Sequence, residues 1–335
     1  MNFHNIYGHE SLIGHLKTAI LLNKVKHAYI LHGEDESGKM MLAEAFAKML
    51  LCEDVETKQS REDSCDRCRS CLQAESKNHP DIIYVTHEKA SIGVEDIRLQ
   101  LNNDIAIKPY SSEYKIYIID EAEKMTEQAQ NALLKTIEEP PEYAIILFLV
   151  NNISALLPTI LSRCVQLNLR PVAKGTIKSL LMKKYQIPDY LADVSASFSG
   201  GNVGKAIQFA TSDSFATMKG TVIDLVNHIA DMPVTTMMEN IKGLAEEKAK
   251  IGDYLDLLLL WYRDVLIYKA TNDYDELMFA EDGRNITRYA KKLEYDQIET
   301  IMKAIDKAKV RLKANVNFDI AMEMMLLTIK ENENG

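Results

Sequence analysis

The sequence predicts an α/β fold in its first half and an all-helical second half. Short apolar runs alternate with helical patterns up to about residue 170, which predicts a parallel sheet covered by helices on both faces. A glycine-rich loop follows the first apolar run and opens a helix, as a phosphate-binding loop does. Beyond about residue 213, apolar residues recur at helical spacing with almost no strand pattern.

The composition is that of an ordinary soluble protein with more than one domain. The chain has 335 residues, of which 47% are hydrophobic and 26% charged, and this length predicts two or three domains. A net charge of −10 argues against a broad surface that coats nucleic acid, although a local basic patch is still allowed. No apolar run approaches the ~20 residues of a membrane helix. Residues 1–5 lack the pattern of a secretory signal, so we expect a cytoplasmic protein with no membrane partner.

The first stretch with recognisable chemistry begins at a predicted strand, residues 28–31, that follows a helical pattern at residues 8–25. A Gly-x4-Gly-Lys loop comes next, and residues 40–50 predict the following helix. The glycines let backbone N–H groups approach a phosphate, while the helix N-terminus and the lysine add positive charge. The candidate nucleotide-binding residues of this degenerate P-loop are Gly33, Ser37, Gly38, Lys39 and Met40.

One position departs from the phosphate-binding pattern. The lysine is normally followed by Ser or Thr, whose hydroxyl holds Mg²⁺ on the nucleotide, and here Met40 takes that place. A thioether is a soft ligand, whereas Mg²⁺ prefers hard oxygen ligands. We therefore expect a loop with the shape and charge for phosphate but without the metal anchor. Efficient hydrolysis of ATP with Mg²⁺ in this site is not expected.

Four of the five cysteines lie at the start of, or within, a polar stretch at residues 53–79. Cys-x2-Cys spacing brings two thiolates onto one metal ion through a tight turn. Metal binding also explains how a stretch with few apolar residues holds its shape, because it supplies folding energy. We predict a closed, structural zinc site; free thiols, a redox pair, or His79 in place of one cysteine are the alternatives. The predicted ligands are Cys52, Cys65, Cys68 and Cys71.

A second strand is predicted at residues 81–86, then a helix at 94–105 and a third strand that starts at residue 115 and ends in Asp120-Glu121. An apolar strand ending in two acids is the Walker B pattern, in which the first acid helps to hold Mg²⁺ and the second polarises the attacking water. For the pair alone, a solvated strand end is the simpler interpretation. The P-loop upstream favours the Walker B interpretation.

A helix is predicted at residues 126–138 and is stopped by two prolines. Residues 144–150 form a fully apolar fourth strand, after which Asn151 and Asn152 follow. Their amides can sense a γ-phosphate, and a plain turn that ends the strand is equally consistent with the sequence.

A short helical pattern at residues 156–163 carries the triplet Ser162-Arg163-Cys164 and leads into a fifth strand, residues 165–169. Together with the P-loop, the Asp-Glu pair and the cysteine cluster, this triplet resembles the clamp-loader subunits of bacterial DNA polymerase III, which belong to the AAA+ ATPase superfamily. The resemblance extends from the start of the chain to about residue 210. Beyond that point it consists of length and helical character.

The resemblance implies a specific architecture. An AAA+ nucleotide-binding-like domain would cover residues 1–170, with the four-cysteine zinc module inserted at about residues 52–79. A small helical lid would follow at residues 171–212, and an all-α collar domain for oligomerisation would occupy residues 213–335. In this last part, helical apolar patterns include a methionine-rich stretch near the end of the chain, and both that stretch and the lone Trp261 are expected in the core.

The resemblance also implies roles for single residues. Arg163 would be an arginine finger that acts in trans on the nucleotide of a neighbouring subunit, a contribution of ~10³–10⁵ in rate. Without the resemblance, pairing of Arg163 with a local acid is the simpler interpretation. Where the lid of the family carries a sensor arginine, this chain offers Gly204 or Lys205. Asp120 and Glu121 would then be a vestigial Walker B pair in a weakened site.

The sequence therefore predicts a clamp-loader subunit of the DNA polymerase III holoenzyme in replication, with weak or absent ATPase activity. The implied partners are the other subunits of a hetero-pentameric ring, the sliding clamp, and primer–template DNA reached through the complex at the replisome. One alternative is an autonomous ATPase that uses Lys39, Asp120 and Glu121. Another is a zinc-dependent DNA-binding protein, which the acidic balance disfavours.

Overall fold

The structure is a computed structural model that describes residues 2–54, 63–87, 89–233, 235–237, 239, 251–274, 277–314 and 316–334. Part of the predicted zinc module, residues 55–62, lies outside the described residues. The chain forms two compact units, Met1–Gln208 and Phe209–Gly335. The division into a sheet domain, a lid and a collar with boundaries at residues 170 and 212 stays a prediction.

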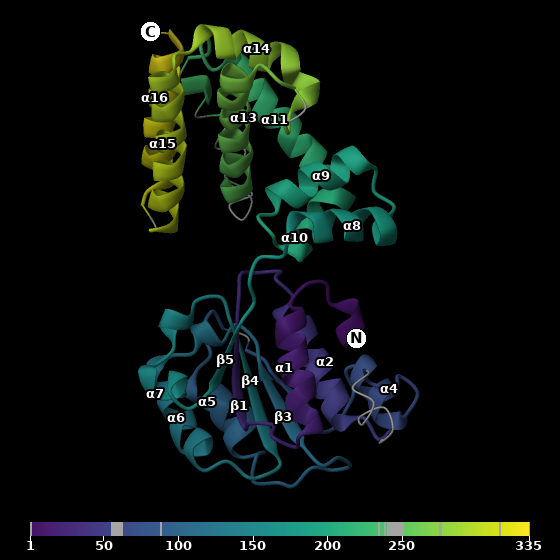
Figure 1. Ribbon diagram of the computed structural model, residues 1–335. Coiled ribbons are helices and arrows are strands. Elements are labelled where there is room, and N and C mark those ends of the chain that lie inside the picture. The colour runs from purple at the N-terminus through teal and green to yellow at the C-terminus, as the bar shows by residue number, and fades with distance from the viewer. Residues whose placement is uncertain are drawn as a thin grey trace. The chain divides into compact units, whose positions relative to one another are not determined.

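A five-stranded parallel sheet forms the centre of the first unit (Figure 1). Its strand order is β2-β3-β4-β1-β5, and each neighbouring pair is parallel. Parallel neighbours require crossover connections, which the intervening helices supply. The predicted parallel α/β sheet is therefore confirmed. The strands are β1 (Ala28–His32), β2 (Ile82–Val85), β3 (Lys115–Ile119), β4 (Ala144–Val150) and β5 (Val165–Asn168).

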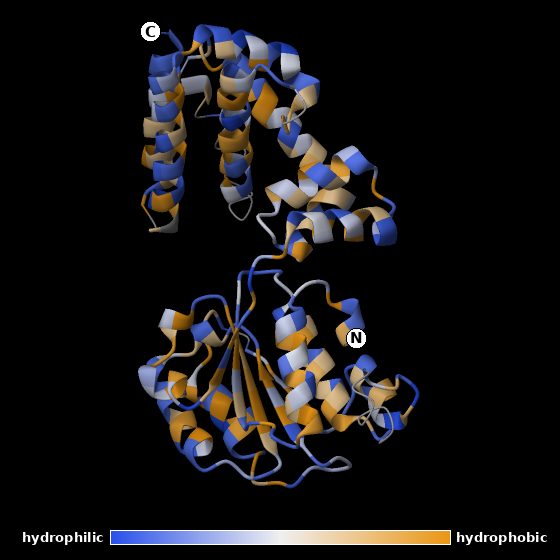
Figure 2. Cartoon of the chain, viewed as in Figure 1, coloured by the Kyte–Doolittle hydropathy of each residue, from blue (hydrophilic) through white to orange (hydrophobic). Residues whose placement is uncertain are grey.

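Helices cover both faces of this sheet, because its apolar side chains alternate between them. Along β1, Tyr29 and Leu31 join one apolar cluster, whereas Ala28 and Ile30 join the other. The strands form the hydrophobic layer in Figure 2, and the outer helix faces are more hydrophilic. The first face carries α1 (Glu10–Leu21), α2 (Lys39–Leu51) and α4 (Arg69–Glu75), and the second carries α5 (Val94–Ile97), α6 (Glu127–Glu138) and α7 (Pro158–Leu161).

Local sequence signals explain where several of these helices begin and end. The Thr126 hydroxyl accepts a hydrogen bond from the Ala129 N–H at 3.2 Å, which caps α6 at its N-terminus. The helix predicted over residues 94–105 is shorter than expected, because α5 ends at Ile97 and a π-helical turn, η2 (Arg98–Asn102), continues the chain. Short 3₁₀ turns complete the unit: η1 (Phe3–Asn5), η3 (Ala122–Lys124) and η4 (Ile153–Ala155).

Three helices follow β5: α8 (Lys174–Tyr185), α9 (Asp189–Phe198) and α10 (Val203–Thr211). Buried Ile177, Leu180 and Leu181 of α8 face buried residues of α9, and these two helices pack together. A turn at Gly200 and Gly201, both with positive φ, connects α9 to α10. The helical structure expected at residues 171–212 is therefore present.

The second unit is helical wherever it is described. It contains α11 (Asp213–His228), α13 (Ile251–Thr271), η6 (Ala280–Asp282), α14 (Gly283–Lys292), α15 (Tyr295–Lys313) and α16 (Phe318–Asn334). Trp261 is fully buried and packs edge-on against Tyr262 and Tyr289, so its predicted role in packing is confirmed. The methionine-rich stretch is core only in part, because Met322 and Met325 are buried but Met324 is exposed. Among the described residues, none of the helices combines the length and apolarity needed to cross a bilayer.

A buried carboxylate in this unit makes its stability depend on pH. Asp264 on α13 is fully buried, accepts a hydrogen bond from the Phe279 N–H at 2.7 Å, and leaves its other oxygen without a hydrogen-bond partner. Burial raises the pKa of Asp264 to about 6, against opposing effects of the Phe279 and Met278 amides and the charges of Arg263 and Lys219. The folded state therefore favours the protonated acid more than the unfolded chain does.

We expect the second unit to lose stability as the pH rises through about 6, because a raised folded-state pKa stabilises fully only below the unfolded value of 3.8. A shift of this size corresponds to about 3 kcal/mol. Calorimetric melting of the full chain between about pH 4 and pH 7, which spans the range between the two pKa values, measures the effect. Asp264→Asn should flatten the pH dependence of the unfolding temperature of this unit, and an equal slope in both proteins would refute the assignment.

Candidate functional site

The P-loop spans the turn between β1 and α2, and two glycines permit its path. Gly38 has φ +95°, a conformation that side chains rarely adopt, and it directly precedes α2. A Cβ on Gly33 would lie 2.7 Å from Ser37 Oγ and 3.0 Å from the Leu169 Cβ, so the loop turns too closely for a larger residue. The strand, loop and helix of the sequence prediction are therefore present in the predicted order.

The Lys39 ammonium group is the charged centre of this loop. It is almost fully buried and donates to Gly33 O at 2.8 Å, Glu34 O at 2.7 Å and Asn151 Oδ1 at 2.5 Å. Burial lowers the pKa of Lys39, while the charge of Asp35 and other nearby carboxylates opposes the shift. The lysine is thus already committed to acceptors of the protein itself.

The neighbouring Met40 side chain packs against the apolar cluster beneath the first face of the sheet. It offers no hard oxygen ligand for Mg²⁺ and instead contributes to the core. The Ser37 hydroxyl, which sequence analysis included in the site, is buried and has no hydrogen-bond partner. Neither residue supplies a hydroxyl in the place where the phosphate-binding pattern requires one.

The predicted Walker B acids follow β3. Asp120 is exposed, and one of its oxygens accepts a hydrogen bond from the Glu121 N–H at 3.0 Å. Glu121 has φ +48°, and its carboxylate contacts Lys124 Nζ at 2.7 Å and His87 Nε2 at 3.4 Å. The contact with Lys124 lowers the pKa of Glu121. Two cationic or polar partners therefore hold the acid that would have to polarise a water molecule.

The fold brings most of the predicted nucleotide-site residues together at one pocket of about 380 Å³. Asn151 joins the site by accepting from Lys39 and donating from Nδ2 to Asp35 Oδ1 at 2.5 Å. The sequence left open whether Asn151 ends a turn or belongs to the site, and the structure shows it in contact with the P-loop. The residues that line the pocket are Asp35, Glu36, Gly38, Lys39, Met40, Met41, Asp120, Glu121, Asn151 and Gly204.

Sequence analysis missed the contact between this loop and the start of α10. The Asn202 side chain donates to Asp35 O at 2.6 Å and also accepts the Lys205 N–H at 3.2 Å, so one residue caps the helix and contacts the loop. The Gly204 N–H donates to Glu36 O at 3.2 Å. An Asn before a helix is an ordinary capping signal, and nothing in the sequence indicates that its amide also reaches the P-loop.

Gly204 is the residue that allows this close approach. A Cβ at Gly204 would lie 2.4 Å from Glu36 O, whereas a Cβ at Gly175 would meet no atom within 4 Å. Both glycines are the second residue of their helices, α10 and α8. Gly204, one of the two residues that the resemblance offers in place of a sensor arginine, is thus in direct backbone contact with the loop.

Arg163 lies in the turn after α7, and its side chain is 37% exposed. Its guanidinium contacts Glu138 Oε1 at 2.8 Å and donates to Thr159 O at 2.9 Å. The local acid considered in the sequence analysis therefore exists. Arg163 is not among the described residues that line the pocket at Lys39. Burial raises the pKa of the adjacent Cys164 to about 12, and its side chain packs against the apolar cluster of the second face of the sheet.

The four predicted metal ligands come together from three places in the chain. Cys52 follows α2, Cys65 and Cys68 flank a turn, and Cys71 lies in α4. Their four sulfur atoms all lie within 4.8 Å of one another, and the Cys65 and Cys71 sulfurs are 3.9 Å apart. Zinc–sulfur bonds of about 2.3 Å place tetrahedral ligands about 3.8 Å apart, so the cluster fits Zn²⁺.

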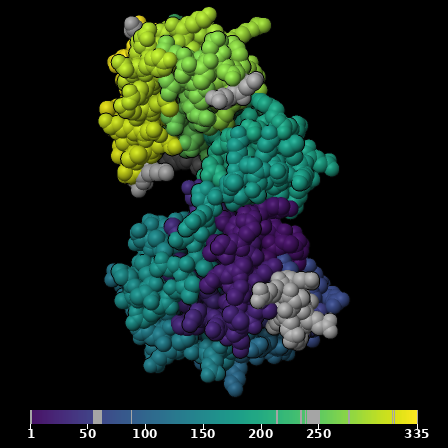
Figure 3. Space-filling model, in the orientation of Figure 1, coloured from purple at the N-terminus to yellow at the C-terminus, as the bar shows by residue number. Residues whose placement is uncertain are grey.

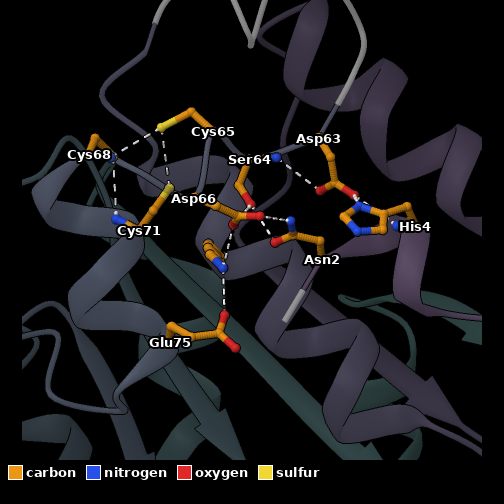
Figure 4. Close-up of polar contacts among 10 residues, drawn as sticks. Asn2, His4, Asp63, Ser64, Cys65, Asp66, Cys68, Cys71 and Glu75 are labelled. Carbon is orange, nitrogen blue, oxygen red and sulfur yellow. Dashed lines mark hydrogen bonds and ion pairs between the residues drawn. The ribbon is translucent and has the colours of Figure 1, made fainter.

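Backbone amides donate to two sulfur atoms of this cluster, whereas burial raises the pKa of the Cys52 and Cys71 thiols. The Cys68 N–H donates to Cys65 Sγ and the Cys71 N–H to Cys68 Sγ, both at 3.4 Å (Figure 4). For Cys65, burial is outweighed by such contacts, which lower its pKa to about 7. His79 is not part of the cluster, because its ring contacts Ser70 Oγ at 3.0 Å and accepts the Asp81 N–H at 3.1 Å.

The parallel sheet, the P-loop with its two acids and the helices that follow define a P-loop α/β type of nucleotide-binding-like protein. Two family models match the chain: one described as "DNA polymerase III, delta subunit" over residues 8–173, and one as "DNA polymerase III, delta subunit, C terminal" over residues 226–331. The DNA polymerase III subunit delta' of Bacillus subtilis is 30% identical over 319 residues, which cover 94% of each chain. The chain belongs to the family of DNA polymerase III delta' clamp-loader subunits.

Other similarities are more distant. The DNA polymerase III subunit tau of Bacillus subtilis is 24% identical over 96% of this chain and 60% of its own length. The solved structure of the Bacillus subtilis DNA clamp loader delta protein aligns with 95% of this chain and 99% of its own, at 12% identity and a TM-score of 0.32. The family assignment rests on the family models and the delta' relative.

We expect Gly204→Ala to destabilise the first unit by about 1–3 kcal/mol, because the added methyl group must displace the P-loop carbonyl or the helix. The matched control, Gly175→Ala, should be neutral or stabilising by up to about 1 kcal/mol, as alanine normally is in a helix. Thermal unfolding of both variants measures the difference. Equal unfolding temperatures would show that the contact between α10 and the P-loop contributes nothing.

Proposed function

We propose that this clamp-loader subunit does not hydrolyse ATP efficiently itself and instead supplies Arg163 to the nucleotide site of a neighbouring ATPase subunit. The complex would load the sliding clamp onto primed DNA, which the chain reaches through its partners. The observation that carries the proposal is a contrast: the P-loop lysine is committed to protein acceptors, whereas the Arg163 side chain lies exposed outside its own pocket.

Three features support a weak site in this chain. Lys39 would have to exchange its present acceptors for phosphate oxygens. Met40 provides no Mg²⁺ ligand and packs into the core. The Glu121 carboxylate is engaged by Lys124 and His87. The P-loop keeps its shape and its positive charge, so ATP hydrolysis is expected to be weakened more than nucleotide binding.

The surroundings of Arg163 support a role in trans. Its ion pair with Glu138 is partly exposed on both sides, and exposed ion pairs contribute only about 0–1 kcal/mol. Release of the guanidinium therefore costs little. A phosphate offers stronger, charge-assisted hydrogen bonds than an exposed carboxylate, so a neighbour's nucleotide would compete effectively with Glu138.

An exposed apolar stripe on the second unit supports assembly through that unit. Its members lie on α15, on α16 and in the loop between them, where they recur along one side of α16 at helical spacing. Such a surface is typical of a protein interface. We propose that it contacts neighbouring subunits in a hetero-pentameric ring. The stripe consists of Val310, Val316, Ile320, Met324 and Leu327.

The four cysteines would hold Zn²⁺ as a structural ion. Four protein ligands complete a tetrahedral shell and leave no open position for catalysis. When bound, the ion would supply cross-links between the end of α2, the turn at Cys65 and α4.

The test of the arginine finger is ATP turnover by a reconstituted clamp loader in the presence of clamp and primed DNA. With Arg163→Ala we expect a sharp fall in turnover, because the affected site loses a factor of about 10³ or more. Arg98→Ala is the matched control, since Arg98 is also exposed and paired with a nearby acid, Glu95. Size-exclusion chromatography establishes that all complexes assemble. Unchanged turnover with Arg163→Ala would contradict the role in trans.

The test of the weak site uses the chain alone. We expect ATP turnover at background for the wild-type chain and equally for Lys39→Ala, because the Mg²⁺ ligand is missing. Steady turnover that Lys39→Ala abolishes would instead favour the autonomous ATPase. The arginine experiment and this one fail independently, so each outcome identifies which part of the proposal is wrong.

A further inference from the structure

A buried lysine lies beneath the cysteine cluster. Lys48 on α2 is 4% exposed, and its ammonium group contacts Asp66 Oδ1 at 2.7 Å and Glu75 Oε2 at 2.5 Å. Lysine is rarely buried unless it is paired. Both carboxylate partners belong to the metal module, Asp66 in its turn and Glu75 at the end of α4. Lys48 of the P-loop helix thus places a buried positive charge next to the loop that carries the cysteines.

Asp66 is the key partner, because it lies between two of the predicted ligands. It follows Cys65 directly, precedes Cys68 by two residues, and has φ +59° in the left-handed region. A residue with a side chain adopts this conformation at a cost of roughly 1–2 kcal/mol. The backbone at Asp66 sets how Cys65 and Cys68 approach each other, so the interactions that hold Asp66 also hold the ligand pair.

The beginning of the chain contacts the same turn (Figure 4). The Asn2 side-chain amide is buried and donates to Asp66 Oδ2, while its oxygen accepts the Ser64 hydroxyl at 2.7 Å. The His4 N–H donates to Asp63 Oδ2 at 2.8 Å. The polar network therefore joins three stretches distant in sequence: the first residues, the P-loop helix, and the turn of the metal module. Figure 3 shows the N-terminal stretch, in purple, at the surface of the first unit.

We propose that Lys48 is a positioning residue for the metal site: through Asp66 it fixes the turn that presents Cys65 and Cys68, and it couples metal binding to the docking of the N-terminal residues. Groups that orient metal ligands without touching the ion typically change metal affinity by about 10–100-fold when they are removed. Lys48 acts through Asp66, which its ammonium group contacts, whereas the candidate ligand atoms are the four cysteine sulfurs.

The substitution Lys48→Met tests the positioning role. Methionine keeps an unbranched apolar side chain for the core, and the carboxylates of Asp66 and Glu75 are about half exposed, so water can take the place of the ammonium group. The matched control is Lys77→Met, because Lys77 also pairs with a carboxylate, Glu44, but is mostly exposed. Zinc affinity is measured on the full chain by competition with a chromophoric chelator. We expect Lys48→Met to weaken zinc binding by about 10–100-fold and Lys77→Met to leave it unchanged.

If Lys48→Met does not fold even with zinc in excess, Asp66→Asn tests the same positioning role. It removes the charge that Lys48 contacts while keeping the size of the side chain, and the same loss of affinity is expected. Zinc affinity equal to that of the wild-type chain in the folded variants would overturn the proposal. Absence of stoichiometric zinc binding by the wild-type chain would overturn it as well.

Hydrogen exchange at the His4 amide, compared at saturating zinc, is a readout that weaker metal affinity alone would not change. This N–H donates to Asp63 in the module, so its protection reports the docking of the N-terminal residues. We expect faster exchange after zinc removal from the wild-type chain, and also in Lys48→Met saturated with zinc. Exchange that is independent of zinc and of Lys48 would refute the coupling.

Discussion

The register of the parallel sheet is the constraint on which the nucleotide-like site depends. β1 runs beside β4 with His32 opposite Val150, and the Gly33 N–H donates to Val150 O at 3.1 Å. The P-loop and Asn151 therefore leave the sheet side by side. β3 lies on the other side of β4, so Asp120 emerges at the same edge. A slip of β4 by one residue would direct Asn151 away from Lys39, because side chains alternate between the faces of a strand.

Lys39 of the P-loop has a structural role that does not depend on ATP hydrolysis. Lys39 binds two backbone carbonyls of the loop and the Asn151 amide, and thereby ties the loop to β4. An acceptor that is buried without a partner costs about 1–3 kcal/mol. The loop can consequently lose the hydroxyl that binds Mg²⁺, as at Met40, and still depend on its lysine. Retention of Gly-x4-Gly-Lys is thus compatible with an inactive site.

The sequence predicted those parts of the fold that local patterns encode. Apolar runs located the five strands, Pro140 and Pro141 located the end of α6, and the three-residue spacing of Cys65, Cys68 and Cys71 predicted that their sulfur atoms lie together. The sequence did not predict contacts between residues that are far apart in the chain. Lys48 is the one charged residue in the otherwise apolar run of residues 45–52, and its ion-pair partners come from the metal module that folds over α2. The contact of Asn202 with Asp35 spans 167 residues, and no local signal marks it.

Arg163 illustrates why a local contact and a role between subunits are compatible. Its pairing with Glu138 has the geometry of an ordinary surface ion pair, which salt and solvent weaken. A subunit interface excludes water, so the same guanidinium would interact more strongly with phosphate there than with Glu138 in the free chain. The ion pair with Glu138 would then keep the Arg163 side chain ordered before assembly. After assembly, the guanidinium would leave Glu138 and bind the neighbour's phosphate. For an arginine in a buried ion pair, leaving its carboxylate for a phosphate would cost several kcal/mol. The pair of Arg163 with Glu138 is partly exposed, so the same exchange costs less.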